Sequence, residues 1–238
     1  MASSLADWER RLARLAEGSI GASLAGSPAD AAGLADAFRD DLGHRRPEDG
    51  AFLRAHLGLP PPPTPTATPE SRLWALAGTP DAAAPPDPLI GPANAEGPLL
   101  LGHETRAIEV ATDAELCAIH ALWAIGERTP AWRDRALAAA RWCVDELQPD
   151  NATNEPWAIH VFLMIDSLEG DAAAGLYAQT LLHNAMVAGA GTRAGGASGG
   201  PSGGPLPARS AWIIRDAAMR LRREVERDER ARSGRHGP

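Results

Sequence analysis

The sequence contains no lysine, so all 23 of its basic residues are arginine. Alanine, glycine and proline are abundant as well, a combination typical of a GC-rich coding bias. We attribute the arginine excess to that bias and not to a special use of guanidinium chemistry. The chain is 238 residues long and 44% hydrophobic, which is enough for one or two domains with a real core.

Cysteine is scarce too, since only Cys117 and Cys143 are present. Two cysteines cannot define a disulfide framework in a chain of this length. Both lie in apolar helical patterns, so we expect them to be buried as small hydrophobic residues. No apolar run approaches the roughly 20 residues of a membrane-spanning helix. The N-terminus also lacks the apolar segment of a secretory signal, so a cytoplasmic protein without membrane association is expected.

Several catalytic and cofactor motifs are missing. The sequence has no P-loop, dinucleotide-binding fingerprint, Gly-x-Ser-x-Gly or Cys-x-x-Cys motif, and no cofactor is predicted. The net charge is −8, and residues 113–171 hold eleven acidic residues against four arginines. Such a surface repels phosphate backbones, so nucleic acid is not an expected partner.

An eleven-residue phrase occurs twice, forty residues apart. Glu-Leu-Cys-Ala-Ile-His-Ala-Leu-Trp-Ala-Ile at 115–125 matches Glu-Pro-Trp-Ala-Ile-His-Val-Phe-Leu-Met-Ile at 155–165 in the positions of Glu, Ala, Ile, His and the last Ile. A period of this size is typical of stacked helical hairpins. The sequence therefore predicts an all-α fold of stacked antiparallel helical hairpins, either an α-solenoid or a partial α/α barrel.

Apolar residues at three- and four-residue steps predict the individual helices. Thr112 and Glu115 have capping-box spacing, which predicts that a helix begins there, and Asn154 is the expected cap of a later helix. Leu99 to Val110 is predicted to form a short β-hairpin. Other helices are expected at 4–17, from Ser27-Pro28 onward, at 48–58, after Thr68, and at about 131–148, 171–189 and 209–231.

Proline and glycine divide the chain into segments. Four successive prolines predict a semi-rigid spacer, and seven glycines predict a flexible tether. The expected segments are N-terminal helices at 1–59, a proline-rich spacer at 60–70, a helical-repeat core at 71–190, a glycine-rich tether at 191–207, and a C-terminal amphipathic helix with a frayed tail at 208–238.

The two histidines of the repeated phrase are candidate site residues. Equivalent positions of successive hairpins lie close together, so His120 and His160 should be neighbours. Two imidazoles are too few for a metal site. The glutamate of each phrase lies about 140° around the helix from its histidine, so the two side chains cannot chelate the same ion. We therefore predict no metal site, and each histidine has an alternative structural role within the helix packing.

The loop at 145–155 is the densest polar cluster and lies between the two copies. Carboxylates at the rim of a helical barrel can serve as acid and base in sugar chemistry. In that interpretation Asp150, Glu155, His120 and His160 are catalytic. In the structural interpretation the same loop holds ordinary turn and cap residues on a solvated surface.

Three functional hypotheses follow. The leading one is a non-catalytic scaffold or interaction protein that binds a protein partner or self-associates, with a tethered C-terminal helix that docks onto the partner or onto its own chain. The alternative is an α/α-barrel-type enzyme or sugar binder that uses acidic rim residues. In the third, the chain is a subunit that a partner completes with further hairpins.

Overall fold

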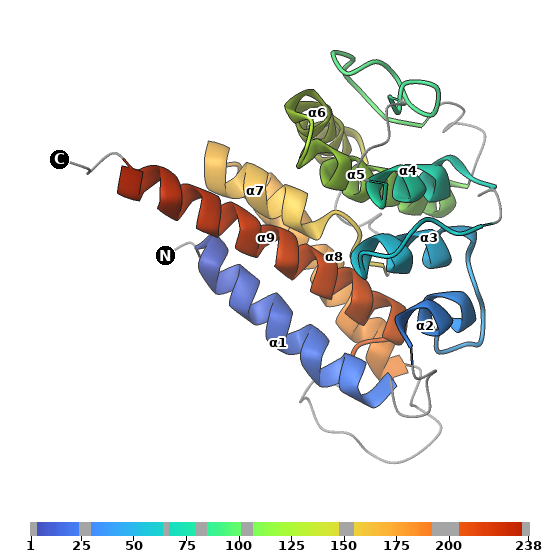
Figure 1. Cartoon of the computed structure of the whole chain (residues 1–238). Helices are drawn as coiled ribbons and strands as arrows, with labels where there is room; N and C mark the ends of the chain where they lie inside the picture. The colour runs from blue at the N-terminus through green and yellow to red at the C-terminus, as the bar shows by residue number, and fades with distance from the viewer. Residues whose placement is uncertain are drawn as a thin grey trace.

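All regular structure in the described part of the chain is α-helical, so the prediction of an all-α fold is confirmed there. The computed structural model describes residues 4–23, 30–63, 67–79, 85–100, 107–147, 155–191 and 205–234. The helices, shown in Figure 1, are α1 (Leu5–Ser23), α2 (Ala31–Ala37), α3 (Pro47–His56), α4 (Pro69–Ala77), α5 (Ile108–Gly126), α6 (Pro130–Glu146), α7 (Ile159–Glu169), α8 (Ala172–Gly191) and α9 (Ala208–Gly234).

Two predicted helix starts agree with the structure. Ser4 and Asp7 cap α1 reciprocally, since each side chain accepts a hydrogen bond from the backbone N–H of the other. Thr68 caps α4 by accepting from the N–H of Ser71. The predicted start at Ser27-Pro28 lies outside the described residues, and α2 is capped by Asp30.

Three sequence predictions near the repeated phrase are wrong. Helix α5 begins at Ile108, so Thr112 and Glu115 lie inside it and do not cap it. The same helix contains residues 108–110, so the expected second strand of a β-hairpin is helical, and no strand occurs in the described residues. Helix α7 begins at Ile159, after a turn in which Ala158 takes a left-handed conformation with φ of 55°. Asn154, the expected cap of this helix, lies outside the described residues and is not its N-cap.

The repeated phrase therefore occurs in two different local structures. The first copy lies entirely within α5, whereas the second begins in the turn before α7. Helix α5 packs against α6, and α7 packs against α8. The α5–α6 turn is tight, because a Cβ added to Gly126 would lie 2.5 Å from the backbone nitrogen of Arg133.

Helix α9 lies against elements from both ends of the chain. It packs along α1 and against α7, and Figure 1 shows α1 and α9 side by side. Its buried apolar side chains include Trp212, Ile213, Ile214 and Leu221, which belong to the same core as residues of α1, α3, α5 and α7. Segments that the sequence assigns to the N-terminal helices and to the C-terminal helix thus share one core.

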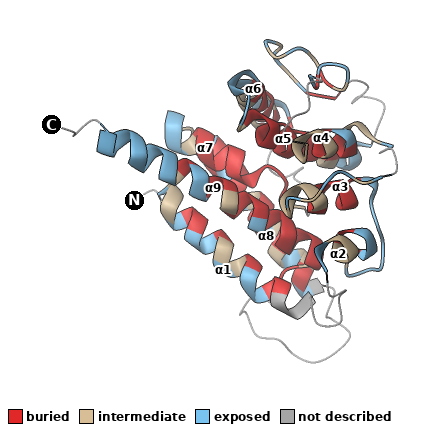
Figure 2. Cartoon of the chain, viewed as in Figure 1, coloured by how far each residue is buried: buried red, intermediate tan, exposed pale blue. Residues whose placement is uncertain are grey.

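The two ends of α9 differ in exposure. Residues 208–221 are mostly buried, whereas every residue from Glu226 to Gly234 is exposed, as Figure 2 shows. Ion pairs between Glu226 and Arg230 and between Asp228 and Arg232 connect successive turns of this exposed end. In the part of the chain that the structure describes, a membrane-spanning helix is not found.

Candidate functional site

His120 and His160 lie side by side in the core, as the repeat predicts. Their ring centroids are 4.3 Å apart, and both side chains are completely buried. The Nδ1 atom of His120 accepts a hydrogen bond from the N–H of Ala158, so its proton is on Nε2, 2.9 Å from Oδ2 of Asp216. Burial lowers the pKa of His120 to about 4, which keeps the ring neutral at pH 7.

His160 has no comparable partner. Within the described residues, neither of its ring nitrogens has a hydrogen-bond partner, and it packs against Trp123 and His120. Burial holds its pKa well below the usual value. A search of the described residues finds no group of three or more His, Cys, Asp or Glu side chains that could hold a metal ion. Both histidines pack against aromatic rings in this structure, and His120 also contacts the carboxylate of Asp216.

Asp216 of α9 is the polar centre of the core. Oδ1 accepts from Nδ1 of His56 at 2.8 Å, Oδ2 accepts from His120, and Arg220 donates to both oxygens. Burial by itself raises the pKa of Asp216, but Arg220 and the two histidines outweigh it and hold that pKa well below its usual range. The carboxylate thus connects α3 and α5 to α9 as a buried anion.

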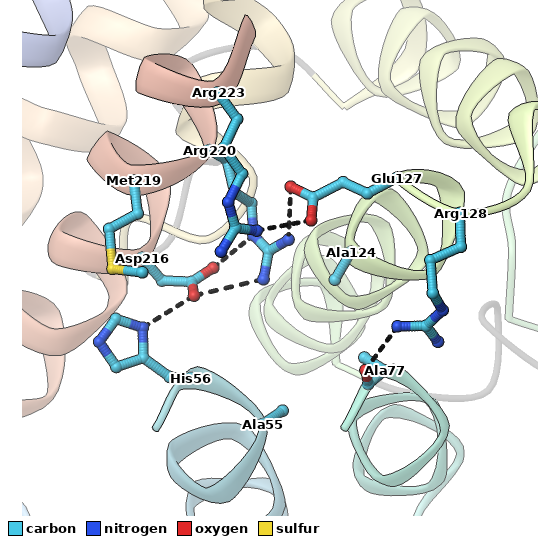
Figure 3. Close-up of a pocket in the computed structure, with 10 residues that line it drawn as sticks. All are labelled: Ala55, His56, Ala77, Ala124, Glu127, Arg128, Asp216, Met219, Arg220 and Arg223. Carbon is cyan, nitrogen blue, oxygen red and sulfur yellow. Dashed lines mark hydrogen bonds and ion pairs between the residues drawn. The ribbon is translucent and has the colours of Figure 1, made fainter. Parts of the chain in front are cut away.

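A pocket opens beside this carboxylate, where the C-terminal ends of α3, α4 and α5 meet one face of α9 (Figure 3). It encloses about 180 Å³ of open space. Its charged lining comprises three arginines and two carboxylates, together with one histidine. The lining residues are Ala55, His56, Ala77, Ala124, Glu127, Arg128, Asp216, Met219, Arg220 and Arg223.

The three arginines of this pocket bind either the end of a helix or the carboxylate of Glu127. The last carbonyl groups of a helix carry partial negative charge and lack intrahelical donors. Arg128 donates to the carbonyl oxygens of Leu76 and Ala77 at the end of α4, at 3.1 and 2.9 Å. Glu127 lies between two other arginines, 3.0 Å from Nη1 of Arg220 and 2.6 Å from Nη1 of Arg223.

Catalytic groups are poorly placed in this pocket. Both oxygens of Asp216 already accept hydrogen bonds, and Figure 3 shows the other edge of the His56 ring turned away from Glu127 and Arg128. Among the described residues, the pocket lining contains no serine, threonine or cysteine. The charged groups around Asp216 are thus engaged in contacts within the chain.

A second charged cluster surrounds the N-terminal end of α9. The buried guanidinium of Arg209 pairs with Glu48, with Asp49 at 2.8 Å and with Glu155 at 3.1 Å. Burial raises the pKa of Glu48 to about 7 and that of the nearby Asp113 to about 6. Glu155 also accepts from the hydroxyl of Ser210, whereas Asp150 lies outside the described residues. The structure thus places Glu155 beside Arg209 and Ser210, at the guanidinium that Glu48 and Asp49 also contact.

Glu115 binds backbone outside its own helix. Its two carboxylate oxygens accept from the N–H groups of Leu99 and Leu100, at 2.6 and 3.1 Å. Burial raises its pKa to about 7 despite these two hydrogen bonds. The carboxylate therefore holds the segment before α5 against the middle of that helix.

The raised pKa of Glu115 predicts a pH-dependent contribution to stability. The folded state binds the proton more tightly than the unfolded chain, so this contribution is full below pH 4.5 and is lost as the pH rises through about 7. We expect wild type to lose about 1–3 kcal/mol relative to Glu115→Gln between pH 4.5 and pH 8. Urea unfolding of both proteins at several pH values tests this, and parallel pH profiles would contradict it.

Sequence reasoning missed several residues of these clusters, namely His56, Glu127, Arg209, Asp216 and Arg220. A signal existed for Asp216, because it lies three and four residues after Ile213 and Trp212, on an apolar face of the predicted helix. A carboxylate on such a face needs a partner when buried. The identity of the partners is not readable from the sequence, since His56 and His120 lie on distant helices.

Comparisons with known proteins add no identification. A scan against protein-family models finds no match, and searches of curated proteins and of solved structures find none either.

Proposed function

We propose that this chain is a non-catalytic interaction protein of stacked antiparallel helical hairpins, which binds a protein partner through the free end of its C-terminal helix. Support comes first from the ionisable groups of the core. His120, Asp216 and Arg209 all serve contacts within the chain. Ionisable groups that are already paired within the chain are poor candidates for acid–base or nucleophilic roles.

The main observation that supports a partner-binding role is the exposed end of α9. Nine consecutive residues, Glu226 to Gly234, continue the helix, and each of them is exposed. At 1.5 Å per residue they extend about 13 Å along the axis. They contain three acidic residues and three arginines, so this arm, residues 226–234, presents alternating charge without net charge. A partner with complementary charges can recognise its register and orientation.

The buried part of α9 anchors the helix to its own chain, and the exposed arm extends from this anchor. Residues 208–221 dock onto the chain itself, whereas the arm remains available. The helix therefore combines both docking modes that the sequence suggests. The intramolecular part fixes the direction of the arm, which reduces the ordering cost of binding.

Site-specific photo-crosslinking in the source cells tests the proposal. A photoreactive residue at the exposed Glu229 should give a discrete adduct, and the same residue at the exposed Asp7 of α1 should not. The captured protein, once purified, should bind the full chain and lose roughly tenfold or more affinity for a chain ending at Val225. Equal affinity for both chains would refute a role for the arm.

The carboxylates around Arg209 favour a second candidate, an α/α-barrel-type enzyme or sugar binder that uses acidic rim residues. Glu48 and Asp113 have raised pKa values of about 7 and 6, as a general acid requires. Glu155 would supply a further carboxylate. Oligosaccharide binding or hydrolysis that is lost in Glu155→Gln, while the melting temperature is retained, would favour this candidate over the interaction protein.

A further inference from the structure

Glu127 occupies an unfavourable position for a carboxylate. It is the C-cap residue of α5, where the partial negative charge of the helix end disfavours an anion. Its side chain is nevertheless 84% buried from solvent, since only 16% is exposed. The two ion pairs with Arg220 and Arg223 offset this cost, so the arginines, and not the helix end, stabilise the Glu127 carboxylate.

The two carboxylates of the pocket differ in how firmly they are held. Asp216 accepts from two histidines and from Arg220, and its side chain is 3% exposed. Among the described residues, Glu127 is paired with Arg220 and Arg223, and the side chain of Arg223 is 48% exposed. A ligand anion can therefore replace Glu127 at Arg223 without breaking the core around Asp216.

Removal of the Glu127 carboxylate would leave a cationic pocket. The charged lining would then be Arg128, Arg220 and Arg223 against the single carboxylate of Asp216. Guanidinium groups bind carboxylates and phosphates through paired hydrogen bonds. About 180 Å³ is comparable to the roughly 150 Å³ of a cavity that holds benzene, so an oxyanion attached to a small organic group fits.

We propose that this pocket is an oxyanion-binding site, in which Glu127 holds the arginine pair until the carboxylate or phosphate group of a ligand takes its place. The site lies on the face of α9 between α3, α4 and α5, and its last lining residue, Arg223, precedes the exposed arm at 226–234. It does not depend on the proposed protein partner, because the arginines act on the ligand directly.

Titration of the full-length protein with inorganic phosphate and with acetate tests the proposal. Binding is followed by calorimetry and by the intrinsic fluorescence of the seven tryptophans, of which Trp74 has its ring centroid 5.9 Å from the guanidinium of Arg220. Glu127→Gln keeps an oxygen for Arg220 but removes the charge, so it should bind the preferred anion about tenfold more tightly than wild type. A preference for phosphate or for acetate identifies which oxyanion the site takes.

Arg223→Ala provides the loss-of-binding variant, because its half-exposed side chain is not needed for packing. Combined with Glu127→Gln, it should abolish the gain of that variant, whereas Arg230→Ala, on the exposed arm, should leave binding unchanged. A folded Glu127→Gln protein that binds neither anion better than wild type overturns the proposal. If Glu127→Gln does not fold, the wild-type protein provides the test. Millimolar binding of phosphate or acetate to the wild type that is lost in Arg223→Ala supports the site, whereas no binding of either anion to the wild type refutes it.

Discussion

A chain ending at Gly191 is expected to lose its cooperative unfolding transition, because this truncation removes all of α9. Four large apolar side chains of α9 leave the core, namely Trp212, Ile213, Ile214 and Leu221. Each contributes about 1.5–3 kcal/mol when buried, so together they supply about 6–12 kcal/mol. That sum is comparable to the total stability of a typical domain, about 5–15 kcal/mol.

The truncation also leaves charges without partners. Glu48 and Asp49 lose Arg209, and His120 loses Asp216. Breaking a buried pair in this way costs more than the pair contributes, because the remaining group stays desolvated. Thermal unfolding followed by circular dichroism should therefore show no sharp transition, and light scattering should show association through the exposed core.

A chain ending at Val225 is the matched control. It retains the buried part of α9 and removes residues 226–238, which include the exposed residues 226–234. Its melting temperature should lie within a few degrees of the full-length value, since exposed side chains contribute little to stability. A compact, cooperatively folded monomer ending at Gly191 would contradict the role given to α9.

The two histidines of the repeated phrase should respond oppositely to the same substitution. His120→Leu removes the partner of both Asp216 and the Ala158 N–H, so we expect a loss of about 3–5 kcal/mol. His160→Leu removes two ring nitrogens that have no hydrogen-bond partner within the described residues. The second variant should be as stable as wild type or more stable by about 1 kcal/mol.

Denaturant unfolding of the two leucine variants measures this difference directly. Both proteins carry the same histidine-to-leucine replacement at completely buried positions, so the change in side-chain volume is matched. The prediction concerns the hydrogen bonds alone. Equal losses in both variants would show that His160 has an essential polar partner.

The apolar periodicity of the sequence predicted a helix correctly where a local capping residue indicates the same helix start. The reciprocal cap of Ser4 and Asp7, the start of α4 after Thr68, and the long C-terminal helix all follow from neighbouring residues. The proximity of His120 and His160 was also predictable, because equivalent positions of a helical repeat share a face. These features depend on contacts that are short in sequence or repeated along it.

The errors arise where a distant segment competes with a local motif. Glu115 has capping-box spacing from Thr112, yet the backbone N–H groups of Leu99 and Leu100 take its carboxylate and α5 starts earlier. The pairing of Asp216 with His56 spans 160 residues. Local propensity carries no information about such a pairing, so the polar core could not be derived from the sequence.

Hydrogen exchange along α9, followed by mass spectrometry, tests most directly whether this helix is part of the core. Amides of residues 211–221 should exchange as slowly as those of α5, through global unfolding, while residues 226–234 should exchange quickly. This pattern would show a docked helix with a free arm. Fast exchange throughout α9, with slow exchange in α5, would show a helix that detaches from a self-sufficient core and would contradict the account.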